Sequence, residues 1–119
     1  MPPYSFEKLD VWQKAKEFTV MIYTITSEFP NSEKFGLISQ LRRAAVSVSS
    51  NIAEGSTRRS MKDQGRFYVM AYGSVVEMLN QLIISKELGY LGDVEYQKLR
   101  NEIEQLTAMI NSLHKATLA

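Results

Sequence analysis

The sequence predicts an all-α protein folded as an antiparallel, up-down-up-down four-helix bundle. Apolar residues recur at steps of three and four along four segments, no segment alternates as a strand does, and turn or capping residues divide the segments. The 119 residues correspond to one domain, spanning 1–119. Short turns make successive helices antiparallel. The expected helices cover about residues 7–28, 33–54, 61–88 and 94–116.

The first helix is predicted from a single apolar row that steps by four or three residues. Its members are Val11, Ala15, Phe18, Ile22, Ile25 and Phe29. Such a row places all six side chains on one helix face. Phe29 precedes Pro30, which disfavours the helical conformation, and Asn31 supplies turn chemistry. The helix should therefore end before Pro30.

The second helix combines an apolar row with unusually short side chains. The row is Ile38, Leu41, Ala45, Val48 and Ile52. The short residues are Ser39, Ala44, Ser47, Ser49, Ser50 and Ala53. Neighbouring backbones can approach such a thin helix closely. Gly55 follows the row, where a left-handed residue often ends a helix, and predicts the stop.

The third helix is apolar over much of its circumference. Ser60 and Asp63 resemble a capping box at its start, and Gly89 follows its last residue, Leu88. Its apolar rows are Phe67, Ala71, Ser74 and Met78; Tyr68, Tyr72, Val75, Leu79 and Leu82; and the flanking Val69, Val76 and Ile83. Three adjoining rows exceed what two neighbouring helices cover, so the sequence predicts a homo-oligomer.

The fourth helix has a regular apolar row, with Asp93 as its expected N-terminal cap. The row is Tyr96, Leu99, Ile103, Leu106, Ile110 and Leu113. Its steps of three and four again place the apolar side chains on one face.

Composition narrows the classes of function. Hydrophobic residues make up 45% and charged residues 23% of the chain, which are ordinary globular values. The absence of cysteine and the single histidine argue against thiol catalysis, cysteine or histidine metal centres and a Ser/His triad. We therefore expect no enzyme, no cofactor and no small-molecule substrate. No secretory signal or charge-free stretch long enough to cross a bilayer is found, which predicts a cytoplasmic protein without membrane contact.

Basic residues cluster although the whole chain carries a net charge of only +1. Residues 34–66 hold seven basic and two acidic side chains. The candidate nucleic-acid-binding residues form two patches, Arg42 and Arg43 in one, and Arg58, Arg59, Lys62 and Arg66 in the other. The patches lie about 22 Å apart along a helix at 1.5 Å per residue.

The second patch lies at an unfavourable place for cations. Lys62 and Arg66 fall at the positive dipole end of the third helix, and they are a like-charge pair four residues apart. A bound anion would offset both effects. That anion is either an RNA phosphate or a carboxylate of a neighbouring subunit.

A polar row follows the apolar row of the second helix. Its members are Gln40, Ala44, Ser47, Asn51, Glu54 and Arg58. We expect Asn51 and Glu54 to form a structural polar layer with Ser74 and Glu77, and the alternative is a binding site. Glu54 and Glu77 could hold a divalent ion in principle, but the Glu-x-x-His motif of di-iron bundles is missing, so no metal site is predicted.

Four sequence motifs carry a resemblance to a known family. They are LDVWQKA at 9–15, QLRRAAVSVSSNIAEGSTR at 40–58, FYVMAYGSVVEMLNQL at 67–82 and ELGYL at 87–91. In this order and spacing the chain resembles the four-helix-bundle family encoded in 23S ribosomal RNA intervening sequences. One departure is that Ser49 and Ser50 stand where many relatives have a proline-serine pair.

The resemblance implies an assembly and a kind of partner. Relatives form a left-turning antiparallel four-helix bundle that assembles into a ring-shaped homopentamer. The accessory protein of diversity-generating retroelements is similar in fold and is a basic ring that works with RNA and a reverse transcriptase. We therefore expect a non-catalytic oligomer that binds RNA or a nucleoprotein through a basic rim. The alternative is a purely structural oligomer without affinity for nucleic acid.

Overall fold

A computed structural model describes residues 4–118, and within them the chain is helical. Its long helices are α1 (Asp10–Thr26), α2 (Leu37–Ser56), α3 (Met61–Glu87) and α4 (Asp93–Lys115), with short 3-10 helices η1 (Ser5–Lys8) and η2 (Asn31–Glu33). The described residues contain no strand, so the all-α prediction is confirmed. Residues 1–3 and 119 of the expected domain lie outside the described part of the chain.

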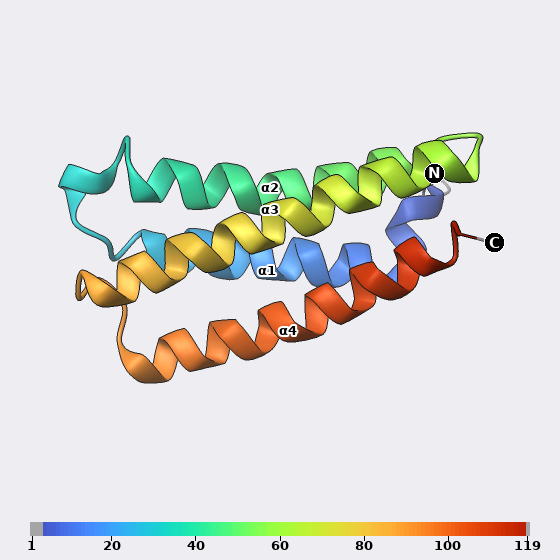
Figure 1. The fold of residues 1–119 in the computed structure, drawn as a ribbon. Helices are drawn as coiled ribbons and strands as arrows, with labels where there is room; N and C mark the ends of the chain where they lie inside the picture. Colours follow the sequence, from blue (N-terminus) through green and yellow to red (C-terminus); the bar gives the residue numbers. More distant parts are fainter. Residues whose placement is uncertain (1–3, 119) are drawn as a thin grey trace.

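The four helices lie lengthwise beside one another, and the chain turns back between each helix and the next (Figure 1). Helix α2 packs on α1 and most extensively on α3, α3 also packs on α4, and α4 packs more sparsely on α1. These contacts are consistent with a four-helix bundle. The end of α2, the start of α3 and the end of α4 come together at one end of the molecule, near both chain termini (Figure 1).

The apolar rows expected from the sequence form the core. Most of their members are buried, and Ile22, Leu41, Ile52, Leu106 and Ile110 are wholly inaccessible to solvent. Burial of one such side chain stabilises the fold by about 1.5–3 kcal/mol relative to its exposure. Ile25, Ile38, Leu79 and Leu113 are only partly buried and pack at the edge of the core.

The first two helices begin later than the sequence indicated. Helix α1 starts at Asp10 because Leu9 has an extended backbone (φ −75°, ψ 125°) that separates it from η1. Helix α2 starts at Leu37 because Gly36 (φ −108°, ψ −115°) lies outside the helical region. The helices expected at 7–28 and 33–54 therefore each contain a break near the start.

The prediction that Gly55 ends the second helix is wrong. Gly55 is a buried residue within α2, and no glycine of the described chain other than Gly89 has a positive φ. A Cβ at Gly55 would lie 2.7 Å from Cε1 of Tyr68 and 2.9 Å from Cβ of Phe67. Glycine is needed here because α3 approaches the α2 backbone closely. The burial at this contact also raises the pKa of Tyr68.

The caps of α3 follow the prediction, whereas the cap of α4 does not. Oγ of Ser60 accepts a hydrogen bond of 3.1 Å from the backbone N–H of Asp63, and Gly89 adopts φ 81° after the helix. Asp93, the expected cap of the fourth helix, is instead its first residue, and Gly92 occupies the N-cap position. The Asp93 carboxylate lies 3.6 Å from Nζ of Lys86, so an ion pair to the preceding helix replaces the cap.

Helix α3 leaves much of its apolar surface uncovered. The uncovered residues, which we call the α3 apolar strip, are Val69, Met70, Tyr72, Val76, Ile83 and Ile84. By length and composition alone α3 is apolar enough to cross a membrane, although the sequence estimate from charge-free stretches indicated otherwise. Core helices of bundles share this property, and the opposite face of α3 is buried in the core.

Candidate nucleic-acid interface

Four cations lie on the turn between α2 and α3 and on the first two turns of α3, and this region has a defined conformation. We call Arg58, Arg59, Lys62 and Arg66 the basic turn. The backbone N–H of Arg58 donates to the carbonyl of Gly55 at 3.1 Å, and Nε2 of Gln64 donates to the carbonyl of Arg58 at 3.0 Å. Together with the Ser60 cap, these bonds fix the start of α3 relative to the end of α2. The four cations therefore project from an ordered scaffold.

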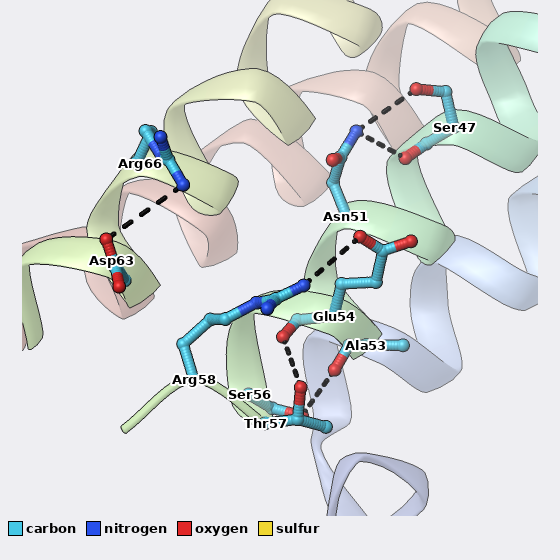
Figure 2. Close-up of polar contacts among 9 residues, drawn as sticks. All are labelled: Ser47, Asn51, Ala53, Glu54, Ser56, Thr57, Arg58, Asp63 and Arg66. Carbon is cyan, nitrogen blue, oxygen red and sulfur yellow. Dashed lines mark hydrogen bonds and ion pairs between the residues drawn. The ribbon is translucent and has the colours of Figure 1, made fainter. Parts of the chain in front are cut away.

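Two cations of the basic turn have acidic neighbours. Nη2 of Arg58 lies 3.8 Å from the Glu54 carboxylate, and Nη2 of Arg66 lies 4.0 Å from that of Asp63 (Figure 2). Both guanidinium groups also lie over the ring of Phe67, at 4.6 and 5.7 Å from its centroid. These ion pairs are exposed, so each contributes only about 0–1 kcal/mol. The ring of Phe67, which belongs to α3, therefore brings both arginines onto the α3 surface.

The other two cations keep their charge uncompensated. Arg59 and Lys62 are exposed, and neither has an ion pair or side-chain hydrogen bond to any residue in the described part of the chain. Lys62 is the second residue of α3, where the helix dipole is positive. The uncompensated charge of the basic turn is therefore concentrated on Arg59 and Lys62.

The end of α4 adds residues that the sequence analysis did not assign to this site. A Cβ at Gly65 would lie 2.7 Å from Oγ1 of Thr117 and 3.5 Å from Cδ2 of His114, so the two helix ends are in contact. A surface hollow of about 570 Å³ lies between them, and Lys62, Arg66 and His114 are among its lining residues. His114 is distant in sequence from the basic turn. The expected antiparallel pairing of α3 and α4 was the signal that could have placed it there, because such pairing brings the end of α4 to the start of α3.

The two arginines of the first patch have different environments. Nε of Arg42 donates to Oγ1 of Thr26 at 2.9 Å, and Nη2 donates to the carbonyl of Tyr23 at 3.3 Å. The guanidinium group of Arg42 also lies 4.6 Å from the centroid of the Tyr23 ring. Arg42 thus supports the C-terminal end of α1. Arg43 is exposed and lines a groove of about 320 Å³ between α2 and α3.

A polar contact layer joins α2 to α3 beside that groove. The hydroxyl oxygens of Ser47 and Ser74 lie 3.0 Å apart. Nδ2 of Asn51 donates to the carbonyl and the hydroxyl of Ser47, at 2.9 and 3.1 Å (Figure 2). Nε2 of Gln81 donates to Glu77 at 3.3 Å and to Gln40 at 3.4 Å. Of the expected layer, Asn51, Ser74 and Glu77 therefore lie along the α2–α3 contact.

Glu54 lies outside this layer, contrary to the expected arrangement. Its side chain is exposed and turns toward Arg58, because the two residues are one helical turn apart (Figure 2). Glu54 therefore does not join Glu77 in the groove between α2 and α3. Among residues 4–118, no group of three or more acidic or histidine side chains is placed to hold a metal ion.

Comparison with known proteins identifies the family. The family model for the 23S rRNA-intervening sequence protein matches residues 7–112. The chain belongs to this family. Its fold resembles the crystal structure of a protein of unknown function from the S23 ribosomal protein family of Bacteroides thetaiotaomicron, with a TM-score of 0.79 and 22% identity. That similarity covers 88% of this chain and 98% of the other.

A second similarity is partial. Two curated proteins, the probable pectate lyases C of Aspergillus oryzae and Aspergillus flavus, are each 35% identical over 68 residues. The aligned segment covers 54% of this chain and 16% of each Aspergillus protein. The chain therefore corresponds to a small part of those proteins, and the similarity assigns it no lyase activity.

Proposed function

We propose that this member of the 23S rRNA-intervening sequence protein family is a non-catalytic homo-oligomer that binds RNA, free or within a nucleoprotein, through the basic turn. The observation that carries the proposal is the uncompensated charge of Arg59 and Lys62 on an ordered turn. Arg58 and Arg66 flank them with partly compensated charge.

Phosphate is the ligand that best fits this turn. The first N–H groups of a helix lack intrahelical partners, and Ser60 satisfies only that of Asp63. A phosphate at the start of α3 would accept hydrogen bonds from these groups and lie favourably in the helix dipole. It would also relieve the repulsion between Lys62 and Arg66. Contacts of this kind are electrostatic and independent of base sequence.

Self-association is part of the proposal. The α3 apolar strip is supporting evidence, since several large apolar side chains on one helix mark an interaction surface. The family resemblance implies five copies in a ring. A ring would present several basic turns to one RNA and increase its apparent affinity by avidity. The cytoplasmic location expected from the sequence stays a prediction.

The alternative proposal is a structural oligomer without RNA affinity, in which a neighbouring subunit's carboxylate binds the basic turn. Glu54 and Asp63 favour this alternative because they already show that the turn accepts carboxylates. The two proposals differ in what charge reversal at the turn disrupts, which is RNA binding in one and assembly in the other.

Charge reversal at the basic turn tests the proposal. The substitutions R58E, R59E and K62E together should abolish binding of a fluorescent RNA, measured by anisotropy, and leave helical content and mass in light scattering unchanged. Lys62→Glu alone should weaken binding for all RNA sequences alike. Lys16→Glu is the matched control, because Lys16 is an exposed helical lysine on α1, outside the basic turn, and its reversal changes the net charge equally.

The outcomes separate the two proposals. Loss of RNA binding by the triple variant at unchanged mass supports the phosphate site. Dissociation of the triple variant into monomers supports the structural oligomer instead. Equal loss of binding in the Lys62→Glu and Lys16→Glu variants would show that general charge, rather than this turn, determines the affinity.

A further inference from the structure

Phe35 is the most exposed aromatic side chain in the described part of the chain. It lies between η2 and α2, and 88% of it is accessible to solvent. The segment that carries it is at the end of the molecule where α2 and α4 begin (Figure 1). Burial of a phenylalanine side chain stabilises a protein by about 1.5–3 kcal/mol relative to its exposure, and Phe35 does not gain this free energy within the subunit.

The segment around Phe35 is held in place by specific contacts. Oε1 of Glu33 accepts a hydrogen bond of 3.2 Å from the N–H of Leu37, and Oε2 accepts one of 3.1 Å from the hydroxyl of Tyr90. The ring of Tyr90 packs on Phe29 with centroids 5.7 Å apart. Phe35 is therefore presented on a fixed support, so little additional conformational entropy is lost when the backbone around it docks.

An apolar groove lies between α1 and α4 near the same end of the molecule. Its walls include Val20, Met21, Ile25 and Leu99, and its volume is about 270 Å³. Val20 is 62% exposed although it belongs to this apolar surface. The groove exists because α4 packs only sparsely on α1 and diverges from it toward this end (Figure 1).

We propose that Phe35 of one copy of the chain inserts into the α1–α4 groove of a second copy, with Lys34 facing Glu95 of that copy. This inference rests on the homo-oligomer part of the proposed function. The groove is large enough, since a cavity of about 150 Å³ accommodates benzene. Lys34 has no ion pair among the described residues, and the groove is lined by one acidic and one basic side chain, Glu95 and Lys98. Glu95 is exposed, so its carboxylate is the group in the groove with which Lys34 can pair.

The positions of the two surfaces favour a second copy as the occupant. Phe35 adjoins α2, whereas the groove lies between α1 and α4, and α2 makes no direct packing contact with α4 in the described chain. Phe35 thus does not fill its own groove. The two surfaces are different and lie near the same end of the molecule. When identical copies pack side by side with parallel axes, Phe35 of one copy and the groove of the next therefore lie at a similar height along the bundle. Such a head-to-tail contact does not stop at a dimer, and it gives a ring where the rotation between copies closes.

Light scattering and analytical ultracentrifugation of the full chain test the proposal. Phe35→Ala should raise the dissociation constant of the oligomer at least about 30-fold, the effect of losing an aromatic hot spot. Tyr4→Ala is the control, because Tyr4 is also an exposed aromatic residue, at 69%, and it precedes η1 rather than lining either of the two proposed surfaces. Circular dichroism should show unchanged helix in both variants, since neither ring belongs to the core.

A charge exchange identifies the partner surface. Lys34→Glu and Glu95→Lys should each weaken assembly, and the double variant K34E/E95K should restore it. Wild-type assembly by the Phe35→Ala protein would overturn the inference and leave the homo-oligomer proposal in place. Additive weakening in the double variant would also overturn it, because Lys34 would then not face Glu95. A wild-type monomer at micromolar concentration would overturn both proposals.

Discussion

Two glycines of the bundle have opposite environments. Gly55 is in contact with Tyr68 and Phe67, whereas a Cβ at Gly73 in α3 would meet no atom within 4 Å. Glycine inside a helix is less stable than alanine by about 0.5–1 kcal/mol, and at Gly73 nothing within the subunit compensates this loss. Gly73 borders the α3 apolar strip, so a close approach by another copy would explain the glycine.

Alanine substitutions should separate the two roles. Gly55→Ala should lower the free energy of unfolding by about 1–3 kcal/mol, because it forces α2 and α3 apart. Gly73→Ala should raise the free energy of unfolding of the isolated subunit by about 0.5–1 kcal/mol. Urea unfolding at concentrations where the protein is monomeric measures both effects. Equal destabilisation by the two substitutions would contradict this account of the α2–α3 contact.

Residue-level chemistry was only partly predictable from the sequence. Arg42 and Arg43 are adjacent and chemically identical, yet Arg42 supports the end of α1 and Arg43 faces solvent. The difference depends on how α2 is rotated against α1, which a single sequence does not specify. The role of Gly55 was not predictable for a different reason, because a helix stop and a close helix contact both favour glycine.

At the level of helices, the sequence predicted all four helices and the ends of α3 and α4 to within one residue, but it did not predict where α1 and α2 begin. The apolar rows identified all four helices because burial determines which face of a helix is apolar. The break at Leu9 and the late start at Leu37 depend on local backbone angles that the apolar period does not encode. Capping chemistry located the start of α3 correctly, because Ser60 acts through neighbours in its own sequence.

The polar layer between α2 and α3 contains a buried group without a partner. Gln81 is only 4% exposed, and its Oε1 has no hydrogen-bond donor among the described residues. Gln81→Met should therefore change the free energy of unfolding by less than about 1 kcal/mol, or increase it, since the unpaired carbonyl is removed. Gln81→Ala, which leaves a cavity, should cost about 2 kcal/mol or more. Thermal unfolding of both variants checks this, and a large loss in the Met variant would show that the amide contacts hold the layer together.

At the scale of the whole molecule, charge and apolar surface are separated. The basic turn lies at one end of the bundle, Phe35 lies toward the other, and the α3 apolar strip runs between them. Sequence alone located the basic turn, because its residues all lie within the short stretch 58–66. It did not locate the α1–α4 groove or the proximity of His114 to α3, since both arise from helices distant in the chain.

The most direct measurement for the central proposal is the salt dependence of RNA affinity in the wild-type protein. If Arg59 and Lys62 each neutralise one phosphate, the logarithm of the association constant should fall linearly with the logarithm of the salt concentration. For single-stranded RNA the slope per subunit should be about −1.4 or steeper. Lys62→Glu should make the slope shallower. Absence of RNA binding at low salt, or an affinity independent of salt, would contradict the proposed RNA-binding function.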